Sequence, residues 1–440
     1  MNFACAGVLN AQQIFENEKL VPISVDEGDR FGNRVAFGSG KLFVAAIGRT
    51  VGSVPSGAVH VFDSQTLEPL FLLEPEDGPA GAFAASIAAS DGLVVVGAYQ
   101  DDVGARDTGS VYVFDADTGE QIRKITLPDA QPYDSFGYAV ALDDGVLVAG
   151  AVGNDDLNES AGAAYLYDVH TGELLRRLDV QGLTEFEFFG SSVAIDDGKV
   201  AVGAPNSRQG AVETGSVRVF DVQTGQLLHD LRPVNAGTFA RFGSSVAIRD
   251  GLIVISARGD DEAGQDAGAA YIFDIQTGDQ LHKLMAPEIE PKTPFGGGVG
   301  FVAGGVLVSQ YGTISSEDQD AGIVHVFDLV SGERKLQLRS SDREDLDLFG
   351  GSTASTNGLI VVAASYDDDN GEDSGAVYLY SFDCVSSADV NLDGKVTPAD
   401  FGAWLKAFNS GGSGCDQNGN GICEPADFSA WVRSFNAGCP

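Results

Sequence analysis

Basic residues are scarce in this 440-residue sequence, which holds 26 Lys and Arg against 64 Asp and Glu. The formal charge of −38 excludes partners that proteins hold by neutralising phosphate groups, so neither nucleic acid nor an anionic membrane surface is expected as a primary partner. No run of 18 apolar residues occurs, and we predict no membrane span. Because 43% of the residues are hydrophobic, the acidic excess is expected on the surface of a folded protein.

Cysteine is missing from most of the chain and then concentrates near its C-terminus. After Cys5 the next cysteine is Cys384. The remaining three are Cys415, Cys423 and Cys439. A short segment with several cysteines is typical of a disulfide-stapled module outside the cytosol, which predicts a secreted or cell-surface protein. Residues 1–17 begin with a short, small-residue-rich apolar stretch that lacks a basic region. We interpret them as a leader or signal remnant, with an ordinary frayed terminus as the alternative.

A Phe-Gly pair recurs along the chain with a nearly constant period. Successive pairs lie 52 to 54 residues apart, and one slot holds Phe-Ala instead of Phe-Gly. The seven copies begin at Phe31, Phe83, Phe136, Phe189, Phe242, Phe295 and Phe349. A self-similar period of this length is typical of repeat architectures and propellers.

Each copy contains four short segments of alternating apolar residues, which predicts four β-strands. In the copy that starts at Phe189, these segments are residues 191–195, 199–204, 216–220 and 226–231. One such sheet cannot bury both of its faces, whereas seven arranged radially can. We therefore predict an all-β fold, a seven-bladed β-propeller of four-stranded blades over residues 18–383. The seventh copy lacks a fourth strand, and residues 18–28, with the strand-like segment Lys19–Val25, are expected to complete it and close the ring.

These repeats resemble the FG-GAP repeat family, known from the propeller heads of integrin α-chains and from many secreted bacterial proteins. The resemblance covers all seven copies and implies a propeller with a face that binds a carbohydrate or protein ligand. Segments such as Gly109–Ile122 also resemble quinoprotein propeller repeats, which usually carry a Trp after the Thr-Gly turn. Here Leu or Ile occupies those strands and both Trp residues lie in the tail, so a quinone-dependent dehydrogenase is disfavoured.

Two similar loops of acidic and amide residues follow Cys384, 27 residues apart. Each has oxygen-bearing side chains at alternate positions, glycine at position six and Asp at position twelve, a pattern that surrounds a hard cation with oxygens. We predict two Ca²⁺ ions, held by Asp389, Asn391, Asp393, Lys395, Thr397 and Asp400, and by Asp416, Asn418, Asn420, Ile422, Glu424 and Asp427. Lys395 and Ile422 would contribute backbone carbonyls. Because Asn420 replaces a carboxylate, we expect the second loop to bind more weakly.

An apolar stripe at helical spacing follows each loop, first at Phe401, Trp404, Leu405 and Phe408, then at Phe428, Trp431, Val432 and Phe435. Residues 384–440 resemble a type I dockerin, and their Cys-flanked ending resembles the GC-type dockerin-like modules of secreted bacterial proteins. The resemblance implies a small all-α module that attaches the protein to a cohesin-like or cell-surface partner. Its partner-binding residues would be Pro398, Ala399, Lys406, Pro425, Ala426 and Arg433.

Four cysteines in this module allow three pairings. Cys384 and Cys439 bracket a module whose ends should lie close together in a two-fold helix pair. We therefore favour a disulfide between Cys384 and Cys439 and a second between Cys415 and Cys423.

Recognisable catalytic motifs are missing: there is no Gly-x-Ser-x-Gly elbow, no His-Glu-x-x-His helix and no phosphate loop. The five histidines follow the repeat, and we expect them on surface strands, with His60 and His325 at a position that other copies fill with Tyr. Acidic residues concentrate in the loops between second and third strands. They favour either simple solvation or further Ca²⁺ sites, of which the best would be Asp367, Asp369 and Asp373.

The sequence thus favours a secreted or cell-surface, non-catalytic binding or adhesion propeller on a calcium-dependent dockerin-like anchor, and we assign no catalytic residue. The alternative is a polysaccharide-degrading enzyme, a glycoside hydrolase or lyase, with the same anchor. Paired carboxylates for such chemistry cannot be singled out by sequence, because Asp and Glu occur in nearly every loop.

Overall fold

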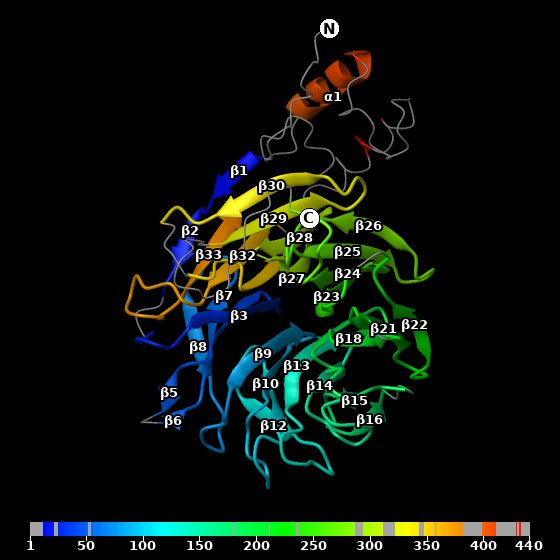
Figure 1. The fold of residues 1–440 in the computed structure, drawn as a ribbon. Helices are drawn as coiled ribbons and strands as arrows, with labels where there is room; N and C mark the ends of the chain where they lie inside the picture. Colours follow the sequence, from blue (N-terminus) through cyan, green and yellow to red (C-terminus); the bar gives the residue numbers. More distant parts are fainter. Residues whose placement is uncertain are drawn as a thin grey trace.

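Seven β-sheets arranged radially about a central axis make up most of the fold (Figure 1). The computed structural model describes residues 12–21, 25–51, 54–178, 180, 182–210, 212–234, 237–286, 294–310, 322–342, 347–356, 358–381, 398–410, 428 and 431–432. Each sheet holds four antiparallel strands, which follow chain order from the axis outward except in the seventh, and the sixth has an additional strand. The predicted seven-bladed propeller of four-stranded blades is confirmed.

The strands of the first four blades follow the repeat closely. Blade 1 contains β3 (Phe31–Gly38), β4 (Lys41–Ala46), β7 (Ala58–Asp63) and β8 (Pro69–Leu73). Blade 2 contains β9 (Phe83–Ser90), β10 (Leu93–Ala98), β11 (Ser110–Asp115) and β12 (Gln121–Ile125). Blade 3 contains β13 (Phe136–Asp143), β14 (Val146–Ala151), β15 (Ala163–Asp168) and β16 (Leu174–Arg177). Blade 4 contains β17 (Ser192–Asp196), β18 (Lys199–Ala204), β21 (Ser216–Asp221) and β22 (Leu227–Leu231).

The remaining blades complete the ring. Blade 5 contains β23 (Phe242–Arg249), β24 (Leu252–Ala257), β25 (Ala269–Asp274) and β26 (Gln280–Leu284). Blade 6 contains β27 (Phe295–Val302), β28 (Gly305–Gln310), β29 (Ile323–Asp328) and β30 (Arg334–Arg339). Blade 7 contains β31 (Ser352–Thr356), β32 (Leu359–Ala364) and β33 (Ala376–Ser381). Two-residue ribbons, β5 (Thr50–Val51) with β6 (Val54–Pro55) and β19 (Arg208–Gln209) with β20 (Val212–Glu213), extend two of the loops.

The fourth strand of blade 7 comes from the N-terminal part of the chain, as predicted. Strand β2 (Glu18–Leu20) pairs antiparallel with β33, and Lys19 lies opposite Tyr378. Strand β1 (Gln12–Phe15) pairs in parallel with β30 on the outside of blade 6. These four residues belong to the segment assigned above to a leader, so sheet pairing begins upstream of the expected boundary at residue 17. The exposed backbone groups at the outer edge of β30 supply the pairing partners that make this strand possible.

The Phe-Gly pair has a specific role where one blade meets the next. The Phe242 amide donates to the Thr214 carbonyl at the end of a loop in the preceding blade. Its ring is fully buried and meets the Tyr271 ring edge-on, with centroids 5.4 Å apart. Gly243 has φ +92°, and a Cβ there would lie 2.7 Å from the Ser216 carbonyl oxygen of the preceding blade. Glycine accommodates this backbone conformation and this close approach without strain, whereas blade 2 has Ala84 at the same position with φ 70°.

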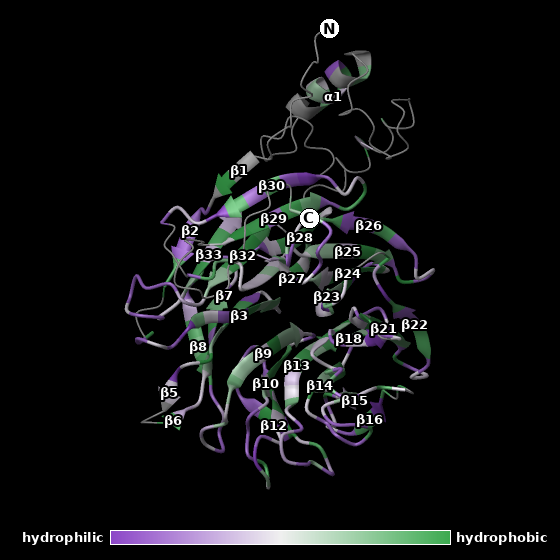
Figure 2. Ribbon diagram, in the orientation of Figure 1, coloured by the Kyte–Doolittle hydropathy of each residue, from purple (hydrophilic) through white to green (hydrophobic). Residues whose placement is uncertain are grey.

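The hydrophobic core is divided into seven clusters, each between two neighbouring blades. The cluster between blades 7 and 1 includes Leu379 and Phe31, so the two ends of the propeller share a continuous core. Figure 2 shows hydrophobic residues concentrated in the strands and hydrophilic residues along the connecting loops. Outside the propeller, helix α1 spans Pro398–Ser410. No helix in the described part of the chain is long and apolar enough to cross a membrane.

Candidate functional site

Because the strands of each blade alternate in direction, the loops between second and third strands lie on the same side as the loops that join consecutive blades. We call this side the loop face. The opposite side, formed by the tight turns of the other hairpins, is the turn face. The acidic loops singled out in the sequence all belong to the loop face, which concentrates carboxylates on one side of the ring.

A charged cluster on the loop face of blade 7 contains two of the predicted calcium ligands. The Lys19 ammonium lies 2.7 Å from Asp342, 2.8 Å from Asp367 and 2.5 Å from Asp369. The Tyr378 hydroxyl donates to Asp367 at 2.6 Å and to Asp342 at 2.9 Å. Asp367 is only 3% exposed, so its charge depends on these partners. The three carboxylates have oxygens within 4.8 Å of one another, and the lysine lies among them.

The same arrangement recurs in other blades. In blade 2 the Lys124 ammonium lies 2.7 Å from Asp77 and 2.8 Å from Asp101, and 4.9 Å from the centroid of the Tyr112 ring. In blade 5 the Lys283 ammonium contacts Asp260 and Glu262 beside Tyr271. In blade 3 Arg177 contacts Asp156 beside Tyr165. We call these groups the rim clusters.

Strand register explains why the rim clusters repeat. The cation is on the fourth strand directly opposite the tyrosine on the third, as in the pairs Tyr112 with Lys124 and Tyr271 with Lys283. The acid comes from the loop that precedes the third strand. In blade 4 the cation is on the third strand instead of the fourth. Arg218 occupies the tyrosine position and lies 3.3 Å from the buried Glu187, and Asp230 on the fourth strand is opposite it. In blades 2, 3, 5 and 7 the cation is thus neutralised by loop carboxylates beside the tyrosine, and in blade 4 Arg218 is neutralised by Glu187 and by Asp230 across the strands.

Blades 1 and 6 carry histidine at the tyrosine position, and both rings are buried. His60 is 4% exposed and His325 is 1% exposed, so the expectation of surface positions was wrong for these two residues. Each ring packs edge-on against the phenylalanine of its own blade, Phe31 or Phe295. Burial, with a smaller effect of the Arg49 charge, lowers the pKa of His60 to about 4. His60 is therefore neutral at physiological pH and belongs to the core.

The cation and the phenol of the blade 7 cluster are each held in one protonation state. Burial lowers the pKa of the Lys19 ammonium, but its hydrogen bonds to Asp342, Asp367 and Asp369 outweigh burial and raise that pKa above its ordinary value. Burial and the hydrogen bond to Asp367 raise the pKa of the Tyr378 phenol. A general acid or base works best with a pKa near the operating pH. Lysine stays charged and tyrosine stays neutral here, an arrangement suited to fixing loops in place.

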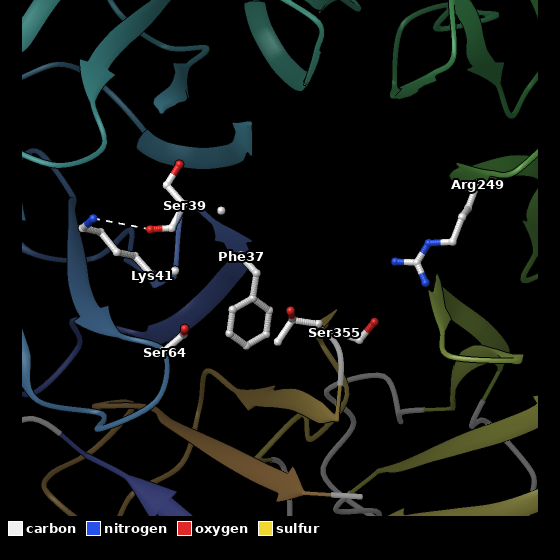
Figure 3. Close-up of a pocket in the computed structure, with 9 residues that line it drawn as sticks. Phe37, Ser39, Lys41, Ser64, Arg249 and Ser355 are labelled. Carbon is white, nitrogen blue, oxygen red and sulfur yellow. Dashed lines mark hydrogen bonds between the residues drawn. The ribbon is translucent and has the colours of Figure 1, made fainter. Parts of the chain in front are cut away.

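A pocket of about 260 Å³ opens on the turn face, at the ends of the innermost strands of blades 1, 5 and 7 (Figure 3). Phe37, Ser39, Lys41, Arg249 and Ser355 contribute to its walls. The Lys41 ammonium pairs with Asp117 at 2.5 Å, and the Arg249 guanidinium lies 5.7 Å from the centroid of the Phe301 ring. None of the residues of the rim clusters lines this pocket. The acidic loops and the pocket are therefore separate features on opposite sides of the ring.

Four segments of the chain match the sequence profile of the FG-GAP repeat, at residues 73–114, 120–167, 229–273 and 334–380. The propeller contains FG-GAP repeats. Each matched segment ends in the third strand of a blade, where the aromatic partner of the repeat's phenylalanine lies. The comparison with curated proteins found no match to the chain.

The FG-GAP propeller brings together only part of the predicted further calcium site. Asp367 and Asp369 share the Lys19 ammonium, whereas Asp373 lies 3.5 Å from Arg30 and its amide donates to Asp368. Asp342, from the loop that joins blades 6 and 7, takes the third position around the lysine. Neither Asp342 nor the role of Lys19 was predicted. The signal for Lys19 was present in the repeat, as a Lys or Arg at a fixed position opposite Tyr.

Most residues predicted for the module after the FG-GAP propeller lie outside the described residues. This holds for the proposed calcium ligands from Asp389 to Thr397 and from Asp416 to Asp427, for Pro425, Ala426 and Arg433, and for the four tail cysteines. Pro398, Ala399 and Asp400 begin helix α1, and Lys406 is exposed on it. The predicted apolar stripes do meet, since the Phe401 ring lies 5.7 Å from the Phe428 ring and 5.4 Å from the Trp431 ring. Trp404 and Trp431 are 4% and 5% exposed.

Proposed function

We propose that this protein is a secreted or cell-surface, non-catalytic binding or adhesion propeller that is attached through a calcium-dependent dockerin-like module. The observation that carries the binding role is the recurrence of the rim clusters on one face of an FG-GAP propeller. They fix the loops of that face with internal ion pairs and hydrogen bonds, and in blade 7 the pKa values of the Lys19 ammonium and the Tyr378 phenol are raised, so that the lysine stays charged and the tyrosine neutral. A rigid scaffold that positions many loops is a common basis for recognition.

The attachment role rests on the tail. Two calcium-loop patterns, each followed by an apolar helical stripe, support a two-fold module, and the ring contacts between the two stripes agree with it. By its resemblance to dockerins, the module would bind a cohesin-like or cell-surface partner through Lys406 and the other residues named above. Disulfides between Cys384 and Cys439 and between Cys415 and Cys423 would stabilise it outside the cell.

Calcium titration of the full chain tests the module. We expect isothermal titration calorimetry to record two binding equivalents, the second loop being the weaker, because carboxylate and carbonyl oxygens at this spacing match Ca²⁺. The double variant Asp389→Ala and Asp416→Ala should lose both equivalents, since each change removes the first ligand of a loop. Asp144→Ala, on an exposed turn of the propeller, is the matched control and should keep both. Calcium binding that survives the double substitution would refute the assignment.

Turnover assays test the non-catalytic role. The full chain, with saturating Ca²⁺, is incubated with xylan, polygalacturonate, carboxymethyl cellulose and pullulan, while new reducing ends and unsaturated uronates are measured. We expect product at the level of the buffer control, because the sequence carries none of the recognisable catalytic motifs. Product that increases with protein concentration on any of these substrates would replace the binding role with the enzyme alternative.

A further inference from the structure

Three neighbouring blades expose an aromatic side chain at the same position of the repeat. Tyr133, Phe186 and Phe239 each lie three residues before the phenylalanine that starts blades 3, 4 and 5. Their exposed fractions are 54%, 44% and 59%. We call these three residues the aromatic arc. Because they belong to loops that join consecutive blades, the arc lies on the loop face.

The backbone at this position does not favour a large side chain. Tyr133, Phe186 and Phe239 have φ values of 70°, 59° and 65°, in the left-handed region that costs a bulky residue free energy. Blade 1 has Gly28 at the same position with φ 80°. The conformation is set by main-chain contacts: the Phe186 amide donates to the Glu159 carbonyl, as the Gly28 amide donates to that of Glu372. Gly28 shows that this turn forms without a ring, and backbone strain kept at exposed residues is typical of functional positions.

The rings of the arc are separate from one another. No ring contact joins Tyr133, Phe186 and Phe239 within the described residues, although Phe186 has Phe188 as a neighbour at 6.4 Å. The adjoining loops carry exposed acids, at Asp155, Asp156, Glu159, Glu185 and Asp261. The core of a protein interface is contiguous and poor in charged residues, so this surface does not suit a large apolar partner. Single rings, one per blade and flanked by hydrogen-bond acceptors, suit a ligand made of repeated units.

The negative charge of the protein restricts which class of ligand can bind at the arc. The formal charge of −38 and the neighbouring carboxylates repel polyanions, which excludes acidic polysaccharides and nucleic acids. A cationic ligand is not favoured at Tyr133, because a cation of the protein already lies over that ring. The Arg106 guanidinium is 5.6 Å from the centroid of Tyr133. A neutral sugar offers an apolar C–H face to an exposed ring and hydroxyl donors to carboxylates.

We propose that the aromatic arc binds a neutral polysaccharide, with pyranose units stacking on Tyr133, Phe186 and Phe239 and hydroxyl groups donating to the flanking carboxylates. The proposal rests on the binding role of the propeller and names its ligand class. Three equivalent positions on consecutive blades would let one chain contact several rings, so that weak individual contacts combine.

Native affinity electrophoresis of the full chain tests the arc, in gels that contain hydroxyethyl cellulose, xylan, galactomannan or pullulan. We expect at least one polymer to retard the protein. Single changes to glycine, such as Phe186→Gly, should weaken binding about three- to tenfold, and the triple change Tyr133→Gly, Phe186→Gly and Phe239→Gly about a hundredfold or more. Because glycine suits φ near +60°, the triple variant should unfold at the same or a higher temperature than the wild type. If the rings instead stabilised the fold, the triple variant would unfold at a lower temperature than the wild type.

Asp144→Gly is the matched control. Asp144 is an exposed residue with φ 45° on the turn face, so this change relieves a similar backbone conformation away from the arc and should leave binding unchanged. Retardation should also persist from about 0.05 to 0.5 M NaCl, since no ion pair is involved. If none of the four polymers retards the wild type, or if the triple variant is retarded equally, the arc proposal is overturned. If the protein binds a basic protein in a salt-sensitive manner and binds none of the polymers, the arc proposal is also overturned. The binding role of the propeller would then still stand. Only product in the turnover assay would refute that role.

Discussion

Replacing Phe242 with alanine is expected to lower the free energy of unfolding by about 3–5 kcal/mol. The Phe242 ring is fully buried between blades 4 and 5 and has edge-on contacts with the rings of Tyr271 and Phe273. Its removal leaves a cavity that the rigid strands on both sides cannot fill. Equilibrium denaturation by guanidinium chloride, followed by tyrosine and tryptophan fluorescence, measures the change.

Phe239→Ala is the matched control for this substitution, because it removes the same side chain three residues upstream. Phe239 is 59% exposed, so its truncation should change the free energy of unfolding by no more than about 0.5 kcal/mol. Equal losses in the two variants would contradict the view that the repeat's phenylalanine is a core residue and the arc's phenylalanine is not.

Replacing Lys19 with methionine is expected to lower the free energy of unfolding by about 3 kcal/mol. The change leaves Asp367, which is 3% exposed, without its cation, and a buried carboxylate that loses its partner costs at least that much. We expect a loss at the low end of the usual range, because water can solvate two of the three carboxylates once the lysine is removed. The Asp342 and Asp369 side chains are 33% and 51% exposed. Thermal and chemical denaturation of the full chain measure the loss.

The control is Lys41→Met, which removes a lysine whose partner, Asp117, is 75% exposed and should cost less than about 1 kcal/mol. A second measurement uses calcium, in a background where Asp389 and Asp416 are alanine. Millimolar Ca²⁺ should restore part of the stability of Lys19→Met, because three carboxylates are then left around one point, and should change that of the parent little. If calcium stabilises the parent as strongly as the Lys19→Met variant, the lysine does not take the place of a cation. Asp367 and Asp369 would then bind calcium while Lys19 is present.

Much of the fold could be predicted because the information is local and repeated. The period of the Phe-Gly pairs and the alternation within each copy gave the number of blades and the order of strands. The ring closure by residues before Phe31 followed from one missing strand in the seventh copy. The pairing of β1 with β30 could not be predicted, because a single short strand has no repeat to reveal it and its partner lies more than 300 residues away.

The candidate sites were predicted less well. Acidic loops suggested calcium at Asp367, Asp369 and Asp373, but a carboxylate's partner depends on what other strands bring to it. Here the partner of the first two is Lys19, which is 348 residues from Asp367 in the chain. His60 was expected on the surface because alternation along a strand does not tell which face another blade covers.

By itself, the sequence determined the seven-fold β-propeller of FG-GAP repeats, because its period and its strand patterns are properties of the chain read locally. The tertiary structure decided which charges are paired and which rings are exposed. Phe242 and Phe239 are three residues apart, yet one is buried between blades and the other is open to solvent. That difference arises only when the next blade packs against the first, since burial is a property of the assembled ring and not of the residue type.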